Sequence, residues 1–270
     1  MKKEPLVSVI VPTKNSGQFL ERCLESIRRQ TYSNIELIVV DNHSTDGTQA
    51  IAKRYTDKVY TWGPERSAQV NFGVGKASGT FVYKVDCDFV LAPAVVQECI
   101  DSAARANDAV VVHNTPDETV SWIARIRKFE VDMYKFDLTH SSARFVRKEV
   151  YDRIGGFNER ITAGEDYDFQ NKLNRGGYKT GFIDAEAVHL GEPKKLMPHL
   201  RKYYAYGKDF VNYKQQNSTE AKSQLGFARV IYIRNWRLFA VHPLKSGQFV
   251  FYHVLKYSFG GVGYLVGRIG

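Results

Sequence analysis

Two short apolar runs near the start of the chain set the strongest limit on its fold. Residues 6–11 (LVSVIV) and 35–40 (IELIVV) have the length of strands and are almost continuously hydrophobic, as in a parallel sheet that is covered on both faces. The segment between them carries apolar residues at the spacing of one helix face: Leu20, Cys23, Leu24 and Ile27. This strand–helix–strand unit predicts a mostly parallel α/β sheet with right-handed crossovers.

The same alternation extends through roughly the first 115 residues. We expect a short strand at 58–61, a helix at 67–77 and a strand from 80 to 86. Because ligands bind such sheets at the carboxyl ends of the strands, Asp41 and Asp86, which each follow a strand, should converge on one ligand.

From residue 142 to 193 the pattern is less regular. We expect a strand at 142–146, a helix at 147–154, a helix from 163 to about 175, and a strand at 179–183 that leads to His189. The second of these helices opens with three acids, Glu165, Asp166 and Asp168. The helix macrodipole favours acids in a first turn, so a purely structural role for them stays open.

Two carboxylates one residue apart, Asp86 and Asp88, end the predicted strand at 80–86. Side chains two apart on an extended backbone point the same way, so both can face one hard cation such as Mg²⁺ or Mn²⁺. The same pattern also occurs in solvated turns. Cys87 between them would be a soft ligand for such an ion, and we interpret it as buried filler.

The charge of the chain is unevenly distributed. The net charge is +9, yet residues 194–270 hold 13 Lys and Arg against two acids, which leaves 25 basic and 27 acidic residues in 1–193. A basic segment of this kind suggests an anionic partner. Large apolar residues interleave with the charges and no nucleic-acid signature is present, so a lipid surface is favoured over nucleic acid. We expect a domain over 1–193 and an extension over 194–270.

Residues 226–242 (GFARVIYIRNWRLFAVH) form an amphipathic pattern when they are placed on one helix. Three arginines fall on one side: Arg229, Arg234 and Arg237. Apolar residues fill the other: Phe227, Ile231, Tyr232, Trp236, Leu238 and Phe239. The pattern predicts a helix in a membrane interface, or a helix packed on its own domain. The uncharged stretch at 257–267 has 11 residues, whereas a spanning helix needs about 20, so we expect surface association.

Three cysteines without paired spacing fit a reducing compartment. No secretory segment precedes the first predicted strand. We therefore expect the protein on the cytoplasmic face of the membrane.

The chain resembles the inverting family 2 glycosyltransferases with the GT-A fold over residues 5–193. The matching pieces occur in the family's order: VSVIVPTKN (7–15), IELIVVDNHSTDGT (35–48), ERSAQVNFG (65–73), VDCD (85–88), GGF (155–157), GEDYDF (164–169) and VH (188–189). The resemblance implies a Rossmann-like sheet flanked by helices, and a nucleotide-diphospho-sugar donor.

The resemblance also implies where the donor nucleotide binds. The loop after the first strand, with Pro12, Thr13 and Asn15, would hold the base and ribose together with Asp41. Arg66 would bind a phosphate of the donor. Asp86 would contact the ribose or support the metal.

A second set of implied roles concerns the metal and the base. Asp88 would be the chief ligand of Mn²⁺ or Mg²⁺, joined by Asp86 and by His189. Asp166 would be the general base that takes the proton of the acceptor hydroxyl. Glu165 would orient the acceptor. Asp168 is the alternative base. Helix geometry turns it about 200° away from Asp166, so only one of the two acids can face the donor.

The expected activity is transfer of a hexosyl group from a UDP- or GDP-sugar to a hydroxyl of a lipid-linked or membrane-bound glycan. One alternative is a sugar-phosphate nucleotidylyltransferase, although the glycine-rich signature of those enzymes is missing after the first strand. A non-catalytic nucleotide-sugar-binding protein is the other alternative.

Overall fold

The computed structural model of the protein describes residues 4–225 and 229–269. The chain divides into two compact units, which are described separately. The sheet unit contains residues 1–114, 142–159 and 172–191, and the helical unit contains 115–141, 160–171 and 192–270. The helical unit thus includes two segments that precede the predicted boundary at 193.

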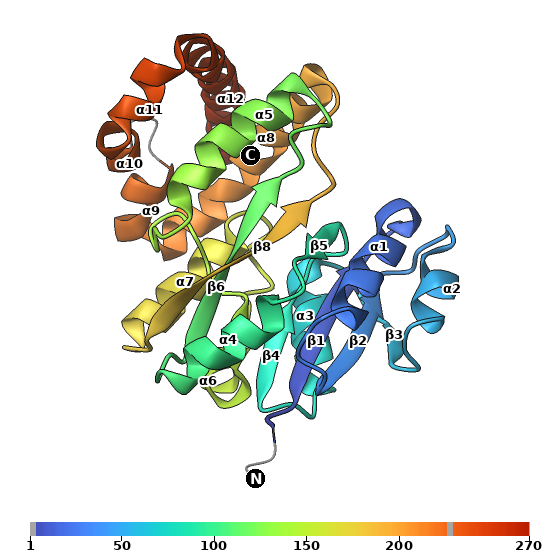
Figure 1. Cartoon of the computed structure of the whole chain (residues 1–270). Coiled ribbons are helices and arrows are strands. Elements are labelled where there is room, and N and C mark those ends of the chain that lie inside the picture. Colours follow the sequence, from blue (N-terminus) through green and yellow to red (C-terminus); the bar gives the residue numbers. More distant parts are fainter. Residues whose placement is uncertain (1–3, 226–228, 270) are drawn as a thin grey trace. The chain divides into compact units, whose positions relative to one another are not determined.

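The described residues form one eight-stranded sheet with the strand order β3-β2-β1-β4-β7-β6-β8-β5 (Figure 1). The strands are β1 (Val7–Thr13), β2 (Ile35–Asp41), β3 (Val59–Thr61), β4 (Phe81–Lys84), β5 (Phe89–Leu91), β6 (Ala109–Pro116), β7 (Phe145–Arg147) and β8 (Thr180–His189). Pairing from β3 to β4 is parallel, whereas β7 runs antiparallel to β4 and to β6, and β5 runs antiparallel to β8. The sheet is therefore mixed, and the predicted parallel order holds for its first half.

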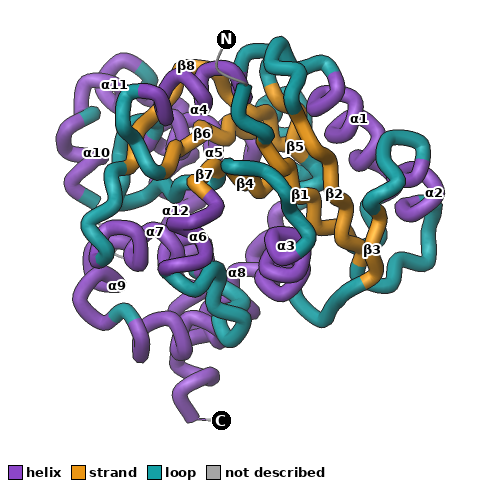
Figure 2. Tube along the Cα trace, turned by 90° about the horizontal axis from the view of Figure 1, so that it is seen from below, coloured by secondary structure: helices purple, strands orange, loops and turns teal. Residues whose placement is uncertain are grey.

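Helices cover both faces of the parallel half. The helices of this unit are α1 (Gly17–Arg28), α2 (Thr48–Lys53), α3 (Arg66–Gly75), α4 (Val95–Ala104) and α6 (Lys148–Arg153), and α7 (Glu165–Arg175) runs from the helical unit into it. The four predicted apolar residues of α1 are buried in one core with alternate residues of β1, which confirms that helix. On the other face, α3 lies so close that a Cβ at Gly73 would come within 2.5 Å of the Ile10 side chain. Figure 2 shows α1 and α3 on opposite sides of β1 and β2.

Three strands differ from the prediction. β5 and β6 were not named in it, and β8 continues six residues beyond the predicted end at 183 to reach His189. β5 and β8 pair with each other over a long sequence separation, with Phe89 opposite His189. A three-residue strand that depends on such a distant partner leaves no periodic signal in its own sequence.

The helical unit contains α5 (Trp122–Val131), η1 (Asp132–Tyr134), α8 (Leu196–Gln216), α9 (Ser218–Leu225), α10 (Val230–Arg234), α11 (Trp236–Val241) and α12 (Pro243–Ile269). Glycines bring α8 and α12 into backbone contact. A Cβ at Gly207 would lie 2.1 Å from the Gly260 oxygen, and one at Gly263 would lie 2.0 Å from the Tyr204 oxygen. Within the described residues, no helix combines the length and the apolar character needed to cross a membrane.

The predicted single helix over 226–242 is wrong. Asn235 separates α10 from α11, and its side-chain amide donates to the Ile231 carbonyl at 2.9 Å, which competes with continuation of the helix. Phe227 lies outside the described residues. The predicted apolar face is also divided: Ile231, Tyr232 and Phe239 pack on a core of α5 and α12, whereas Trp236 and Leu238 are exposed. Arg229 does not join the outer polar face, because it is turned inward.

A buried carboxylate holds this part of the unit together. Glu130 on α5 lies 3.2 Å from Lys256 Nζ, 3.1 Å from His253 Nε2 and 3.8 Å from Arg229 Nη1. The hydroxyls of Tyr134 and Tyr232 donate to the same carboxylate. Burial alone would raise the pKa of Glu130, but the surrounding cations outweigh it and hold that pKa well below its ordinary value. Glu130 thus joins α5 to α10 and α12 as an ionised residue.

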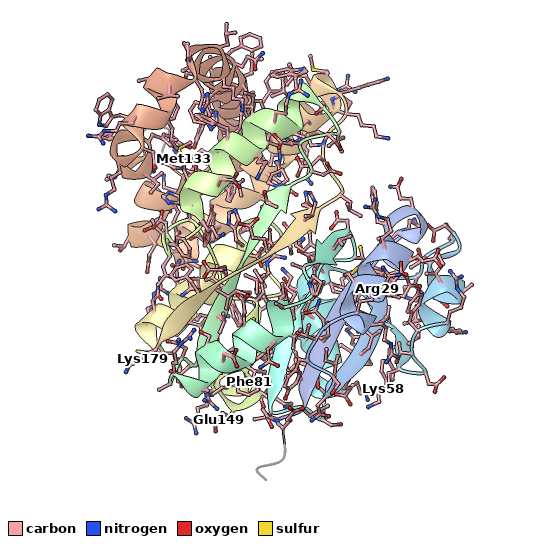
Figure 3. All side chains as sticks on the ribbon, viewed as in Figure 1. Arg29, Lys58, Phe81, Met133, Glu149 and Lys179 are labelled. Carbon is pink, nitrogen blue, oxygen red and sulfur yellow. The ribbon has the colours of Figure 1, made fainter. Side chains whose placement is uncertain are left out.

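We predict that Glu130→Gln lowers the free energy of unfolding by about 3–5 kcal/mol at pH 7, because it leaves buried cations without a counter-charge. Urea denaturation measures this change. The matched control is Glu149→Gln on α6, labelled in Figure 3, whose exposed carboxylate pairs with Arg153 at 3.8 Å. It should change stability by less than about 0.5 kcal/mol.

The contribution of Glu130 to the free energy of unfolding should decrease at acidic pH. Because the folded pKa of Glu130 is depressed, its stabilisation is present above the unfolded pKa of about 4.3 and is lost as pH falls below it. The stability gap between the native chain and Glu130→Gln should therefore narrow on acidification. An equal free energy of unfolding for both chains at pH 7 contradicts the assignment.

Candidate active site

The loops that follow β1 and β2 form one continuous surface at the carboxyl ends of these strands. Asn42 N donates to the Thr13 carbonyl at 2.8 Å. Asn15 has a left-handed backbone with φ 47°; its N–H donates to Ser44 Oγ at 2.7 Å and its side chain accepts from Thr45 N at 2.9 Å. Figure 3 labels Phe81, the first residue of β4, at the opposite end of the strands. The structure thus brings Thr13, Asn15 and the β2 loop together as predicted.

Asp41 is fully buried inside this surface. Its carboxylate accepts from Thr13 Oγ1 at 3.0 Å, from Ser44 N at 2.9 Å, from Ser44 Oγ, and from Gln49 Nε2 at 2.8 Å. Burial would raise the pKa of Asp41, but these hydrogen bonds outweigh it and lower the pKa. A carboxylate has about four acceptor positions, and the chain's own donors fill them. A direct contact with the base stays a prediction.

The backbone turns between the two acids of the Asp-x-Asp pair. β4 ends at Lys84, and Phe89 N donates to the Asp86 carbonyl at 3.0 Å, so residues 86–89 form a turn. The prediction that both carboxylates point the same way from an extended strand is therefore wrong. Cys87 lies within this turn, partly buried, and burial raises the pKa of its thiol to about 12.

Asp86 faces three cations. Arg144 Nη1 donates to its Oδ2 at 2.6 Å, and Lys84 Nζ and Arg66 Nη1 each lie 3.7 Å from its Oδ1. Burial would raise the pKa of Asp86, but the three cations hold it far below the ordinary value. Arg66, at the start of α3, is half-exposed. The predicted phosphate-binding arginine therefore lies beside Asp86.

Asp88 faces His189, with Asp88 Oδ2 and His189 Nε2 3.0 Å apart. The pairing of Phe89 with His189 places these side chains together, and both are about one quarter exposed. The Gly191 backbone lies close against them, because a Cβ there would come within 2.4 Å of Asp88 Oδ2 and 3.1 Å of His189 Nε2.

This partly exposed pair of side chains fits a divalent ion that takes one oxygen and one nitrogen from the protein and its other ligands from phosphates and water. No cluster of three or more His, Cys, Asp or Glu suited to a metal occurs among residues 4–225 and 229–269. The structure therefore brings two of the three predicted ligands together, and Asp86 is turned elsewhere.

The three acids of the Gly-Glu-Asp segment lie in the helical unit, in the first turn of α7. Asp168 is buried and accepts from Asn217 Nδ2 at 3.0 Å. The same buried network includes Asn171 and Tyr213. Glu165 is buried and Asp166 is partly exposed. The geometry favours a structural role for Asp168 and leaves Asp166 as the more accessible acid.

Sequence reasoning missed three residues of this site: Lys84, Arg144 and Gly191. Lys84 was visible as a charged residue inside an apolar strand. Arg144 and Gly191 carried no signal, because their roles depend on contacts with residues far away in the chain.

We predict that Asp41→Asn lowers the free energy of unfolding by about 1–3 kcal/mol at pH 7, because an amide NH₂ would face hydrogen-bond donors. Chemical denaturation tests this, with the exposed Asp57→Asn in the same unit as control. Since the folded pKa of Asp41 is depressed, its contribution should fade as pH falls below about 3.9. If Asp41→Asn keeps its stability but loses nucleotide binding, Asp41 instead contacts the base of the nucleotide.

Sequence comparisons identify relatives. Residues 8–158 match the family model of glycosyl transferase family 2. Chondroitin synthase of Escherichia coli is 28% identical over 195 residues, which cover 66% of this chain and 28% of the synthase. An uncharacterized glycosyltransferase of Rickettsia typhi is 27% identical over 188 residues, 63% of this chain and 59% of that protein. Succinoglycan biosynthesis protein ExoA of Rhizobium meliloti is 23% identical, with 84% and 78% covered. The chain spans less than two thirds of the first two.

Solved structures share the fold. The mannosyltransferase PcManGT from Pyrobaculum calidifontis, in complex with GDP-Man and Mn²⁺, aligns with a TM-score of 0.62 at 18% identity, over 100% of this chain and 76% of that one. S. aureus TarS 1-349 in complex with UDP-GlcNAc aligns with a TM-score of 0.52 at 21% identity, over 77% and 67%. The α/β fold with its mixed, helix-flanked sheet matches the GT-A glycosyltransferases. Since the family model covers more than half of the sequence, the chain belongs to glycosyl transferase family 2.

Proposed function

We propose that this glycosyltransferase is an inverting hexosyltransferase. It would move the sugar of a UDP- or GDP-sugar to a hydroxyl of a lipid-linked or membrane-bound glycan. The corner formed by Asp88, His189 and Gly191 is the observation that supports this most directly. It offers a divalent ion two partly exposed ligands, and a diphosphate would supply others.

Residues in and around this corner would bind the metal ion and the nucleotide sugar. Asp88 and His189 would hold Mn²⁺ or Mg²⁺, and their mixed oxygen and nitrogen set favours Mn²⁺. When bound, the ion acts as a Lewis acid toward the diphosphate leaving group. Arg66 adds a cation within reach of a phosphate. The joined loops with Pro12, Thr13 and Asn15 would receive the nucleoside. The two nucleotide sugars bound by PcManGT and TarS carry different bases, so both remain in the proposal.

Inversion requires one displacement at the anomeric carbon and a base that removes the proton of the acceptor hydroxyl. Asp166 is our candidate, because it is the partly exposed acid of the α7 first turn. Glu165 would orient the acceptor. Asp168 is the weaker candidate, since Asn217 and its buried neighbours engage its carboxylate.

We predict that Asp166→Asn lowers sugar transfer by about 10²–10⁴-fold, the usual contribution of a general base. Nucleotide binding, measured by calorimetry, should stay within about twofold. The matched comparison is Asp168→Asn, which should lower thermal stability because its amide would disturb the buried network. Full activity of Asp166→Asn excludes it as the base.

A thermal-shift screen of UDP- and GDP-sugars with Mn²⁺ would identify the donor, because a ligand of the folded state raises stability by mass action. Release of nucleoside diphosphate in turnover supports a transferase. Release of pyrophosphate would indicate a nucleotidylyltransferase, and binding without turnover across a broad acceptor set would indicate a binding protein.

The extension over residues 194–270 also supports binding to a membrane surface. An exposed apolar surface covers the last helices, and we call it the tail face. It comprises Val230, Ile233, Trp236, Leu238, Val241, Leu244, Val250, Phe251, Val254, Val262, Leu265, Val266 and Ile269. Its members on α12 fall within an arc of about 160° at about 100° per residue. The buried residues Phe249, Tyr252 and His253 lie opposite. An exposed patch of this extent is typical of an interaction site.

Charge favours a lipid surface over a second copy of the chain. No Asp or Glu follows Glu220 in the sequence, and Arg234, Arg237 and Lys245 are exposed beside the tail face. Two such basic faces would repel each other, whereas anionic headgroups would attract them. We therefore propose peripheral binding to the cytoplasmic membrane surface.

We predict that Ile233→Ser, Trp236→Ser and Leu244→Ser together lower binding to phosphatidylserine-containing vesicles at least tenfold, because each removes apolar area from the bilayer contact. Co-sedimentation measures binding. Phe136→Ser is the control, since Phe136 is as exposed as Trp236 and lies in the same unit outside the tail face. Binding should also weaken with salt. A dimer that the triple variant dissociates, without vesicle binding, would assign the face to a second copy.

A further inference from the structure

A largely buried arginine that the reaction scheme above does not use links the surroundings of the two acids of the Asp-x-Asp pair. Arg144 immediately precedes β7, and its side chain is 12% exposed. Its Nη1 donates to Asp86 Oδ2 at 2.6 Å, and its guanidinium lies 4.8 Å from the centre of the Phe89 ring. One side chain therefore contacts the first acid of the pair and the residue that follows the second.

The contacts continue from Phe89 to the metal corner. The Phe89 and His189 rings are 5.1 Å apart in an edge-to-face arrangement with an interplanar angle of 73°. His189 Nε2 in turn lies 3.0 Å from Asp88 Oδ2. An unbroken path of contacts thus runs from Asp86 through Arg144, Phe89 and His189 to Asp88.

The chemistry of the guanidinium suits this position. It is planar and can donate in its plane while an aromatic ring packs on its face, which an ammonium group cannot do with the same geometry. With its amide oxygen facing Arg144, Asn114 accepts from Nε at 3.2 Å and from Nη2 at 3.3 Å. Arg144 is therefore held by a carboxylate, an amide and a ring.

The charged groups around the two acids of the Asp-x-Asp pair also differ. Arg144, Lys84 and Arg66 lie within 4 Å of Asp86, whereas the partner of Asp88 is an imidazole. A carboxylate surrounded by cations is a poor ligand for a further cation. Asp88 instead pairs with the His189 side chain, and imidazole is itself a common metal ligand.

We propose that Arg144 is a positioning residue that assigns the two acids to different tasks. It holds Asp86 away from the ion and, through Phe89, steadies His189 beside Asp88. The ion is then held by Asp88 and His189, and Asp86 serves to anchor the cations that face the diphosphate. This inference rests on the proposed metal-assisted transfer.

The test compares Mn²⁺ binding in matched variants, measured by the electron paramagnetic resonance signal of free Mn²⁺ with and without UDP or GDP. Asp88→Asn should weaken Mn²⁺ binding at least tenfold. Asp86→Asn should change it less than threefold. In the Arg144→Gln chain, Asp86 is released toward the ion, so the added Asp86→Asn substitution should weaken Mn²⁺ binding at least fivefold.

Arg144→Lys separates positioning from mere charge. It keeps the positive charge but loses the ring contact and the planar donor, so it should behave like Arg144→Gln in the comparison with Asp86→Asn. Restoration of the native pattern by lysine contradicts the positioning role. Thermal unfolding of each variant shows whether it folds. The comparison of Asp86→Asn with Asp88→Asn, made in a chain that retains Arg144, tests whether the two acids have different tasks even if the Arg144 variants do not fold.

The outcomes distinguish this inference from the proposed function. If Asp86→Asn and Asp88→Asn weaken Mn²⁺ binding equally in the native background, both acids are ligands and only the role of Arg144 fails. If Asp88→Asn leaves Mn²⁺ binding unchanged, the proposed metal corner itself is wrong, and the inference falls with it.

Discussion

The antiparallel pairing of β5 with β8 is the constraint on which the candidate site depends. It places Phe89 opposite His189, and so brings an imidazole from the end of one strand beside the carboxylate that precedes the other. The turn at 86–89 leads into this pairing, because it changes the backbone direction between β4 and β5. The same turn sends Asp86 toward the cations and Asp88 toward the histidine. One local change of backbone direction therefore separates two acids that an extended strand would have kept together.

Both units contain a carboxylate that is surrounded by more positive charge than it carries. Asp86 lies among Arg144, Lys84 and Arg66 in the sheet unit, and Glu130 lies among Lys256, His253 and Arg229 in the helical unit. In both places the cations keep the acid ionised despite its burial. The clusters differ in access. Arg66 is half-exposed and can meet a ligand, whereas the charged partners of Glu130 are largely buried, which fits a structural role.

The regular part of the fold could be predicted from the sequence, because its signals are local. The buried strands β1 and β2 and the apolar face of α1 read directly from spacing, and all of them are confirmed. The turn after β4, the strand β5 and the extension of β8 could not be predicted in this way. The strand β5 and the extension of β8 depend on pairing between residues about a hundred positions apart, and the turn connects β4 to that pairing. The same limit applies to the site: Asp88 and His189 could be named from the family resemblance, but Arg144 and Gly191 matter only through contacts with them or their neighbours.

The tail shows why an amphipathic pattern alone does not tell which face a helix buries. On a single ideal helix, the aromatic residues of 226–242 form one apolar side and the arginines the other. The chain instead breaks at Asn235, so Tyr232 and Phe239 turn inward while Ile233 and Trp236 stay exposed. Burial of Arg229 against Glu130 removes one charge from the outer side as well. The exposed surface that results includes Ile233 from the arginine side of the wheel as well as Trp236, and it continues along α12, whose other side is packed on the core. A helix with apolar residues on both faces is stable in water only if something covers the second face. The absence of acids after Glu220 is the reason why we propose an anionic bilayer as this partner.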